Sequence, residues 1–190
     1  MSGVQQQIIS LAVVFGVMQV ATKLNLDTPE NANYIRAAYA TMQVVQAALL
    51  YYIYIVINKK NDDTELKYTE VKNAMDSSEA EIVETTVRDY DIAQLRQAVV
   101  AQLVGMMAVV GIHTYWGYLR PMTLQIVLGL KTIYDNPMAK IHLFNQHATG
   151  DLQRPIKPKG MFAPKPAPSV KEIKAKQKKD DKKKVVNKIQ

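Results

Sequence analysis

One uncharged stretch restricts this chain to a membrane architecture. Ala37 to Ile57 contains 21 residues without a formal charge, which is about the length needed to cross a hydrocarbon core roughly 30 Å thick. Arg36 precedes the stretch and Lys59 and Lys60 follow it, so long basic side chains at both ends can reach the lipid headgroups. The sequence therefore predicts a transmembrane helix here.

A second stretch has the same properties. Ala98 to Leu119 is a run of 22 uncharged residues between Arg96 and Arg120. It ends in an aromatic cluster that contains Trp116, and such clusters are typical of the membrane interface. We expect a second full-length membrane helix.

Two further apolar stretches are shorter than the membrane is thick. Ile8 to Ala21 has 14 residues and Met122 to Tyr134 has 13. The first predicts a short or tilted membrane helix that is retained, because a signal peptide normally has a basic start and no basic residue precedes Lys23. The second, which follows Pro121, suits an interfacial, re-entrant or partially crossing helix.

Charge separates the rest of the chain into two polar segments. The central segment has ten acids against five bases, whereas the chain from Arg154 onward has 13 Lys and Arg against 3 Asp and Glu. We expect an all-α integral membrane protein with three to four membrane helices, two of them short. The expected segments are a helical hairpin (1–58), a polar linker (59–91), further membrane helices (92–135), an ordered cytosolic segment (136–158) and a disordered lysine-rich tail (159–190).

Lysines next to membrane helices favour the cytosolic side. This rule places the C-terminal tail in the cytosol, and Lys59 and Lys60 place the linker there too. Four crossings then follow, with the N-terminus also cytosolic. The alternative has three crossings and a lumenal linker.

Polar residues recur on one face of the apolar helices. Arg36, Gln43 and Gln46 are spaced i, i+7 and i+10, which aligns them at about 100° per residue. A lipid-facing amide is costly, so this face should meet protein or water. The candidates for a polar groove are Gln19, Arg36, Gln43, Gln46, Gln102 and His113. The alternative is that these glutamines only join packed helices by hydrogen bonds.

Enzyme chemistry has little support. The chain has no cysteine, no phosphate-binding glycine loop and no nucleophile motif, and His113, His142 and His147 lack metal-ligand spacing. We expect neither a cofactor nor a metal. Asp89 or Asp91 should cap the third helix, and a divalent ion held by paired carboxylates is the less favoured reading.

Three strings of residues resemble a known family. They contain Thr85, Thr86, Val87, Arg88, Asp89, Tyr90 and Asp91; Lys140, His142 and Phe144; and Gly150, Asp151, Arg154 and Pro155. The chain from residue 1 to 158 resembles the fungal membrane proteins known both as inorganic phosphate transport proteins and as the third component of the SRP-independent (SND) targeting route. The resemblance implies a multi-pass endoplasmic reticulum protein that helps to deliver and insert membrane proteins.

The resemblance also implies partners: the Sec translocon with its associated membrane proteins, the ribosome, and nascent membrane-protein clients. The basic tail adds ribosomal RNA or anionic lipid as electrostatic partners. We expect an insertase-like mechanism in which the groove amides hydrate polar client segments. The alternatives are a phosphate-transport-related membrane protein and a translocon scaffold that does not insert clients.

Overall fold

The computed structural model describes residues 3–26, 28–73 and 76–156, and most of them are helical. The elements are α1 (Gly3–Lys23), α2 (Ala32–Lys60), β1 (Glu65–Asn73), β2 (Asp76–Thr86), α3 (Val87–Trp116), α4 (Arg120–Asp135), α5 (Pro137–His142) and the 3₁₀ helix η1 (Gly150–Leu152). The contacts divide the chain into two units. The helical unit is Met1–Asn61 with Asp91–Ala148, and the hairpin unit is Asp62–Tyr90 with Thr149–Gln190.

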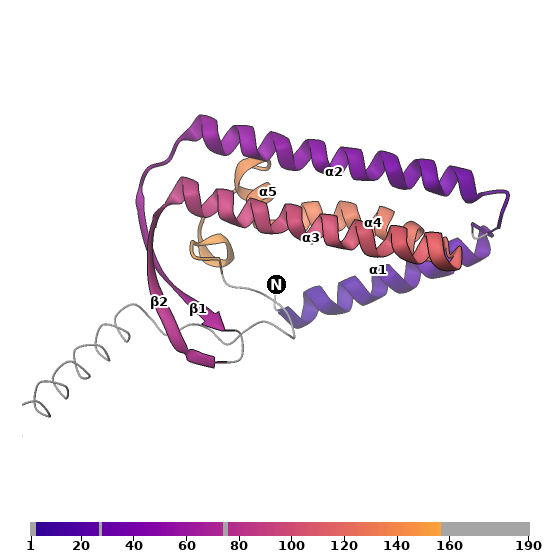
Figure 1. Ribbon diagram of the computed structural model, residues 1–190, viewed down its shortest axis with the longest axis horizontal. Coiled ribbons are helices and arrows are strands. Elements are labelled where there is room, and N and C mark those ends of the chain that lie inside the picture. The colour runs from indigo at the N-terminus through magenta and orange to yellow at the C-terminus, as the bar shows by residue number, and fades with distance from the viewer. Residues whose placement is uncertain (1–2, 27, 74–75, 157–190) are drawn as a thin grey trace, which may run out of the picture. The chain divides into compact units, whose positions relative to one another are not determined.

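Within the helical unit, the short helix α4 is the shared contact of α1, α2 and α5. It packs against α1, α2 and α5, and α5 also packs against α2 (Figure 1). Successive long helices run in opposite directions (Figure 1). The turn from α3 to α4 contains Gly117 at φ 72°, a backbone conformation that side chains with a Cβ rarely adopt. Pro121 lies in the first turn of α4, where its missing N–H costs nothing.

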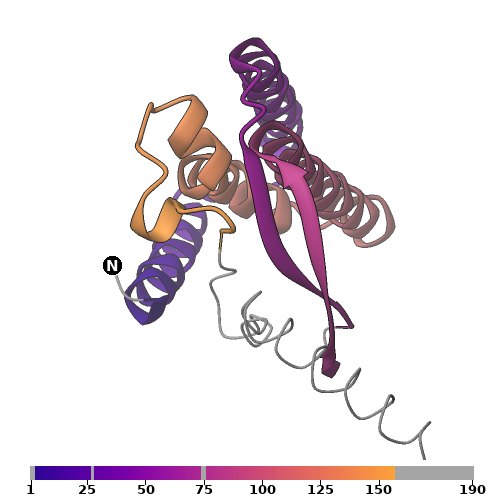
Figure 2. The same cartoon turned by 90° about the vertical axis from the view of Figure 1, so that its left-hand side faces the viewer.

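Two helices, α2 and α3, are long and apolar enough to cross a membrane. Both begin before the apolar stretches that predicted them. They differ in burial, because 28% of the apolar window of α2 is buried against 6% of that of α3. Figure 2 shows the same helices after a turn of 90°, foreshortened along their lengths.

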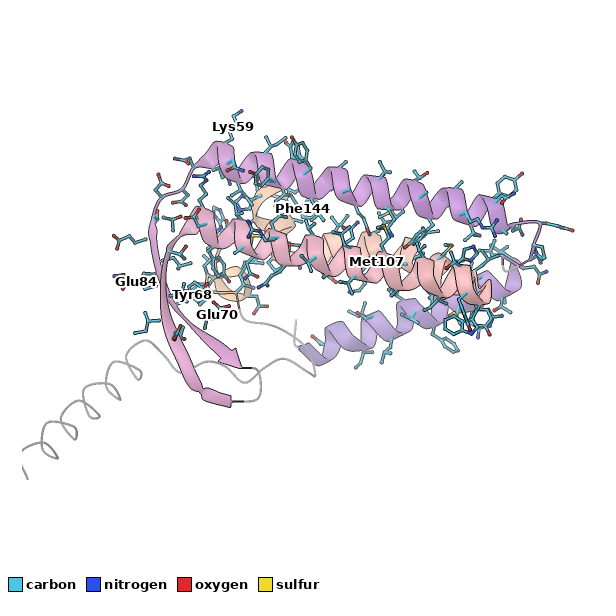
Figure 3. All side chains as sticks on the ribbon, in the orientation of Figure 1. Lys59, Tyr68, Glu70, Glu84, Met107 and Phe144 are labelled. Atoms are coloured by element: carbon cyan, nitrogen blue, oxygen red, sulfur yellow. The ribbon has the colours of Figure 1, made fainter. Side chains whose placement is uncertain are left out.

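Apolar packing in the helical unit is concentrated on one side of α2. Ile53 and Ile57 are fully enclosed, as is Met138 of α5. A second cluster near the start of α2 contains Tyr39 and Met122. Outside these contacts α1 and α3 expose many large apolar side chains, including Leu11, Phe15, Leu103, Val104 and Met107. Figure 3 shows Met107 on α3. Such a surface is unfavourable in water and suits lipid or an apolar partner.

The prediction of an all-α fold is wrong in the segment that was expected to be a polar linker. β1 and β2 form an antiparallel hairpin in which Tyr68 is paired with Val83 and Glu70 with Glu81. The cause is a short alternation of apolar and polar residues in both strands, which is the period of a strand and not of a helix. The expected tail, 159–190, lies outside the described residues.

Candidate functional site

A polar seam runs along the face of α2 that meets α3 and α4. In it, the Tyr39 hydroxyl donates to Gln125 Oε1 at 2.8 Å, and Gln102 Nε2 donates to Gln43 Oε1 at 3.2 Å. Arg36 Nε donates to His113 Nε2 at 3.0 Å. The polar seam is defined by Arg36, Tyr39, Gln43, Gln46, Gln102, His113 and Gln125. Its members come from three helices, so it is a product of tertiary packing.

The middle of the seam has unused hydrogen-bonding capacity. Gln43 accepts from Gln102, but its own Nε2 is buried and has no partner among the described residues. A buried amide without a partner costs roughly 1–3 kcal/mol. The site is therefore prepared to donate a hydrogen bond to water or to a peptide carbonyl.

Gln46 of α2 lies against Gly129 of α4. Its side chain is buried, and a Cβ added to Gly129 would lie 1.9 Å from Gln46 Nε2. Glycine at position 129 leaves room for the Gln46 amide between the two helices, and a larger residue there would require the end of that side chain to move. The amide occupies the space that a side chain at position 129 would fill.

The end of the seam near the start of α2 is held by a histidine in a defined tautomer. Because the Arg36 guanidinium can only donate, His113 Nε2 accepts, and Nδ1 then carries the proton and donates to the Tyr118 carbonyl at 3.1 Å. Arg36 also donates to Asn33 Oδ1 at 2.9 Å. A neutral imidazole is the form that fits these contacts.

The structure brings together most of the residues that were predicted to line a groove. Gln43 and Gln102 pair with each other, as do Arg36 and His113. Gln19 does not join them, because it is exposed on α1.

Sequence reasoning missed Tyr39 and Gln125 as members of the seam. Tyr39 lies one turn after Arg36 and one turn before Gln43, so helical spacing alone would have included it. Because of its aromatic ring, Tyr39 was counted with the apolar residues of this helix. Gln125 was visible only as an interruption of a short apolar stretch.

Two of the family strings meet in a buried pair. His142 Nε2 of α5 lies 2.7 Å from Asp91 Oδ2 of α3, with side-chain exposures of 4% and 1%. A carboxylate only accepts, so His142 Nε2 carries the proton. His142 Nδ1 is buried without a partner among the described residues. The pair ties the start of α3 to α5.

The expectation that Asp89 or Asp91 caps α3 is wrong. The Thr86 hydroxyl accepts from the Asp89 N–H at 3.2 Å and takes the capping position. Asp89 lies in the first turn, where its negative charge is stabilised by the positive end of the helix dipole. Asp91 lies further along the helix and is used in the pair with His142.

The hairpin unit joins the first and third family strings. The Tyr90 ring meets the Tyr68 ring edge-on at 5.3 Å, and the Tyr90 hydroxyl accepts from the Ile156 N–H at 2.7 Å. Ile156 directly follows Arg154 and Pro155. Partial burial, with the nearby Glu70 carboxylate and Tyr90, raises the pKa of Tyr68. Figure 3 labels Tyr68 and Glu70 on this hairpin.

The hairpin also carries an exposed cross-strand ion pair. Lys67 Nζ lies 3.0 Å from Glu84 Oε1. This hydrogen bond, together with the charges of Glu84 and Glu65, raises the pKa of Lys67. Both side chains are largely in solvent, so the pair contributes little to stability.

Two further string residues, Lys140 and Phe144, pack at the end of α4. Lys140 lies 3.8 Å from Asp135 and over the Tyr134 ring, and Phe144 packs against that same ring. Within the described ranges, no group of three or more His, Cys, Asp or Glu side chains is arranged to hold a metal ion.

Comparison with known proteins identifies the family. The model of the family described as Phosphate transport (Pho88) matches residues 4–188. A Schizosaccharomyces pombe protein described as uncharacterized is 34% identical, over 86% of this chain and 83% of that protein. The SRP-independent targeting protein 3 homolog of the same yeast is 35% identical, over 80% of this chain and 78% of that protein.

A relative from budding yeast supports the same family assignment. SRP-independent targeting protein 3 of Saccharomyces cerevisiae is 32% identical, over 82% of this chain and 83% of that protein. No solved structure matches. The resemblance seen in the three strings is confirmed, and the chain belongs to the Phosphate transport (Pho88) family, together with the yeast SRP-independent targeting protein 3 proteins.

Proposed function

We propose that this protein is a multi-pass membrane protein of the endoplasmic reticulum that acts in SRP-independent targeting and insertion of membrane-protein clients. The names of two relatives support the targeting role. The long apolar helices α2 and α3 support residence in a membrane. We propose no catalytic chemistry for it.

The observation that carries the mechanism is the buried Nε2 of Gln43 in the middle of the polar seam, which has no hydrogen-bond partner in the described part of the chain. Moving a polar client flank through hydrocarbon costs several kcal/mol for each unpaired polar group. Donors and acceptors already placed between α2 and α3 lower that cost by substituting for water. The glutamines therefore serve the client as well as the packing.

Helix α3 is the element that moves in this mechanism. Its apolar window is the less buried of the two long helices, and its mid-helix contact with α2 is the Gln43–Gln102 hydrogen bond at 3.2 Å. One such bond between membrane helices is worth only about 0.6 kcal/mol. Opening this mid-helix contact is thus inexpensive and exposes the amides to an arriving segment, while the contacts of Asp91 and His113 hold the two ends of α3.

The orientation follows from the charged ends of the helices. Lys59 and Lys60 end α2, and the C-terminal end of α4 lies near the same end of the helical unit because α5 packs against both helices. We propose that this end is cytosolic and that four segments enter the membrane. With 16 residues, α4 covers only about 24 Å, so the bilayer beside it is thinned. A glycosylation-acceptor scan of residues 62–86 tests this orientation. Glycosylation of the hairpin would place it in the lumen and overturn the proposed orientation.

The proposed partners are the Sec translocon and its associated membrane proteins, the ribosome, and nascent clients. The basic residues beyond 158 provide attraction to ribosomal RNA or anionic lipid. Deletion of residues 170–190 should weaken cosedimentation with ribosomes at low salt. Unchanged cosedimentation would reject the ribosome as a partner of the tail.

The decisive test of the seam is an insertion assay with reconstituted protein. The double variant Gln43→Leu with Gln46→Leu should reduce client insertion while the protein stays folded. Gln19→Leu is the matched control, because Gln19 is exposed on α1 and lies outside the seam. Equal insertion by the wild-type protein, the double variant and Gln19→Leu would reject the seam as the client path and leave the glutamines a packing role.

A crosslinking experiment tests the movement of α3. The chain has no cysteine, so Gln43→Cys with Gln102→Cys introduces the only two thiols. Crosslinking the two thiols with a short bis-maleimide should abolish the insertion activity that the untreated double variant retains, and the same treatment should leave each single cysteine variant at its own untreated activity. Full activity of the crosslinked protein would show that α2 and α3 need not separate.

The family description favours a second candidate, a role related to phosphate transport. Anion permeation needs cationic or helix N-terminal sites near the middle of the membrane, whereas Arg36 lies at the end of the seam. Uptake of labelled phosphate into proteoliposomes separates the two functions. A scaffold that does not insert clients would show neither uptake nor insertion by the purified protein.

A further inference from the structure

The hairpin of β1 and β2 has one face that is apolar near its base and acidic further out. Residues that lie directly opposite each other in an antiparallel pair share a face, as does every second residue along a strand. The pairing therefore puts six side chains on one face, namely Leu66, Tyr68 and Glu70 with their partners Thr85, Val83 and Glu81. These six residues define the Tyr68 face.

The Tyr68 face is only partly covered. Leu66, Tyr68 and Val83 are half-buried, whereas Glu70 and Glu81 are exposed (Figure 3). In the described part of the chain, the sheet has no third strand. A two-stranded sheet is only marginally stable in water unless something packs against one of its faces. The Tyr68 face can therefore accept a further segment.

The chain returns to this face at residue 156. The Tyr90 ring, which is buried, meets the Tyr68 ring edge-on, and the Tyr90 hydroxyl accepts from the Ile156 N–H at 2.7 Å. The segment that follows Ile156 therefore starts beside the Tyr68 face, so little chain entropy is lost if it docks there.

The hairpin and the segment after residue 156 carry opposite charges. Residues 62–90 contain nine acids against three bases, and residues 157–190 contain twelve lysines against three acids. On the Tyr68 face, Glu70 lies directly opposite Glu81, and like charges in directly opposite positions destabilise a sheet. A lysine placed beside these two carboxylates reduces their repulsion.

The spacing of the lysines fits this position. Glu70 lies two residues beyond Tyr68, which is about 7 Å along the strand. Lys159 lies three residues beyond Ile156, with Pro158 between them, and an extended proline-containing chain advances about 3.1 Å per residue. Lys159 can thus come level with Glu70 without a turn of the chain.

From these observations we propose that residues 157–190 dock on the Tyr68 face of the same molecule, with Lys159 beside Glu70 and Glu81. The acidic hairpin repels RNA and anionic lipid, so an anionic partner of the lysines competes with the hairpin for them. The docking rests on the hairpin unit alone, and the competition rests on the proposed function of the tail.

Electron paramagnetic resonance of the full-length protein in detergent tests the docking, with one spin label on Ala163→Cys. The chain has no other cysteine. A docked segment gives a slow component in the spectrum. About 1 M salt should reduce this component, because the Debye length is then only about 3 Å. Dilution of the protein should leave the slow fraction unchanged, because both partners belong to one molecule.

Neutralising the acidic end of the face should release the segment. Glu70→Gln with Glu81→Gln should lower the ratio of slow to fast label about fivefold, since each exposed ion pair contributes roughly a factor of two. The hairpin itself should gain stability, because a like-charge pair is removed. Asp27→Asn with Glu30→Gln is the matched control, with the same change of charge outside the hairpin. Equal slow fractions in the wild-type protein, the test variant and the control would overturn the proposal.

A charge exchange tests the contact in a second way. Glu70→Lys with Glu81→Lys should abolish the slow component, and the further changes Lys157→Glu and Lys159→Glu should restore it. Failure to restore it would overturn the proposed contact. A slow fraction that falls on dilution would assign the face to a second copy of the chain, and one that appears only with phosphatidylglycerol vesicles would assign the lysines to lipid. Either result would overturn docking within one molecule.

An RNA probe tests the competition separately. An excess of polyuridylate should convert the slow label into the fast form at low salt, and a label that stays slow would overturn the competition. A mobile label in a protein whose tail deletion still weakens ribosome cosedimentation would reject the docking alone. A slow label together with unchanged cosedimentation after that deletion would reject the ribosome as a partner and leave the docking in place.

Discussion

Helices α2 and α3 are similar in length and hydropathy, yet they are held in the unit in different ways. α2 buries an apolar side chain on almost every turn, from Ile35 through Ile53 to Ile57. α3 buries fewer apolar side chains, Leu95 among them, and is also held by polar contacts at three separated points, which are made by Asp91, Gln102 and His113. The difference shows that hydropathy predicts a membrane span but not its place in a bundle. That place depends on which few side chains face the neighbouring helices.

The largest effect should come from the buried pair that holds the start of α3. Asp91→Ala leaves a buried imidazole without its carboxylate and should lower the free energy of unfolding by about 3–5 kcal/mol. Denaturation by increasing SDS in mixed micelles, followed by circular dichroism, measures it. His142→Ala should cost a similar amount, and the double variant less than the sum. A loss under about 1 kcal/mol would mean that α3 is not anchored by this pair.

Apolar truncation should affect α2 strongly and α3 weakly. Ile53→Ala removes a fully buried side chain and should lower the unfolding free energy by about 2–4 kcal/mol. Val104→Ala on α3, where the side chain is 62% exposed, should stay within about 0.5 kcal/mol of the wild-type protein. The same SDS titration compares them. Equal losses of unfolding free energy in the two variants would mean that α2 and α3 do not differ in how far apolar burial stabilises them.

Two glycines provide a matched test of close packing. Gly129→Ala places a Cβ against Gln46 and should cost about 1–3 kcal/mol, because the core between α2 and α4 is overfilled. Gly111→Ala on α3 meets nothing within 4 Å and should be neutral or stabilising by up to about 1 kcal/mol. Thermal unfolding in detergent measures both. A Gly129→Ala variant as stable as the wild-type protein would show that the end of the Gln46 side chain moves aside without cost.

The amide contact between the two helices should have a small energetic effect. Gln43→Leu removes the hydrogen bond to Gln102 and should change stability by about 0.6 kcal/mol. A double-mutant cycle with Gln102→Leu isolates the pairwise energy. A coupling energy above about 2 kcal/mol would show that the seam is a structural lock and would argue against its opening for clients.

The smallest effect should come from outside both helices, in the hairpin. The pKa of Lys67 is raised above its ordinary 10.5, so its contribution to stability is complete below that pH and is lost as pH rises through the raised pKa. The raised pKa of Tyr68 acts in the same direction, since its ionisation above pH 10.0 is easier in the unfolded chain.

Lys67→Met should remove the lysine part of this alkaline loss and leave neutral-pH stability almost unchanged. Unfolding followed between pH 9 and about 12 checks it, with Lys59→Met as the control. A large destabilisation at neutral pH would show that the exposed pair matters more to the hairpin than surface ion pairs usually do.

The parts of this structure that sequence predicts are the ones that depend on local pattern. The two long helices follow from uninterrupted apolar runs, and the polar face of α2 follows from the spacing of Arg36, Gln43 and Gln46. The hairpin was missed because its alternation is short and is mixed with many charged residues, so no apolar face stands out.

The contacts between helices were less accessible. The pairs of Gln43 with Gln102 and of Asp91 with His142 join residues more than fifty positions apart. Their choice depends on how the helices are rotated and shifted along one another, which no single stretch of sequence specifies. The pairing of Tyr39 with Gln125 is of the same kind, because each residue alone reads as an ordinary member of an apolar helix.

The close approach at Gly129 also predicts how these proteins vary. Because the Gln46 amide occupies the volume beside Gly129, a larger residue at 129 requires either that the end of the Gln46 side chain moves or that the residue at 46 is shorter. The two positions should therefore change together among relatives, with alanine or serine at 129 accompanied by a small side chain at 46. Positions 111 and 129 are both glycine here, but they should vary differently among relatives. Position 111 should accept other residues independently, whereas a substitution at 129 should be accompanied by one at 46.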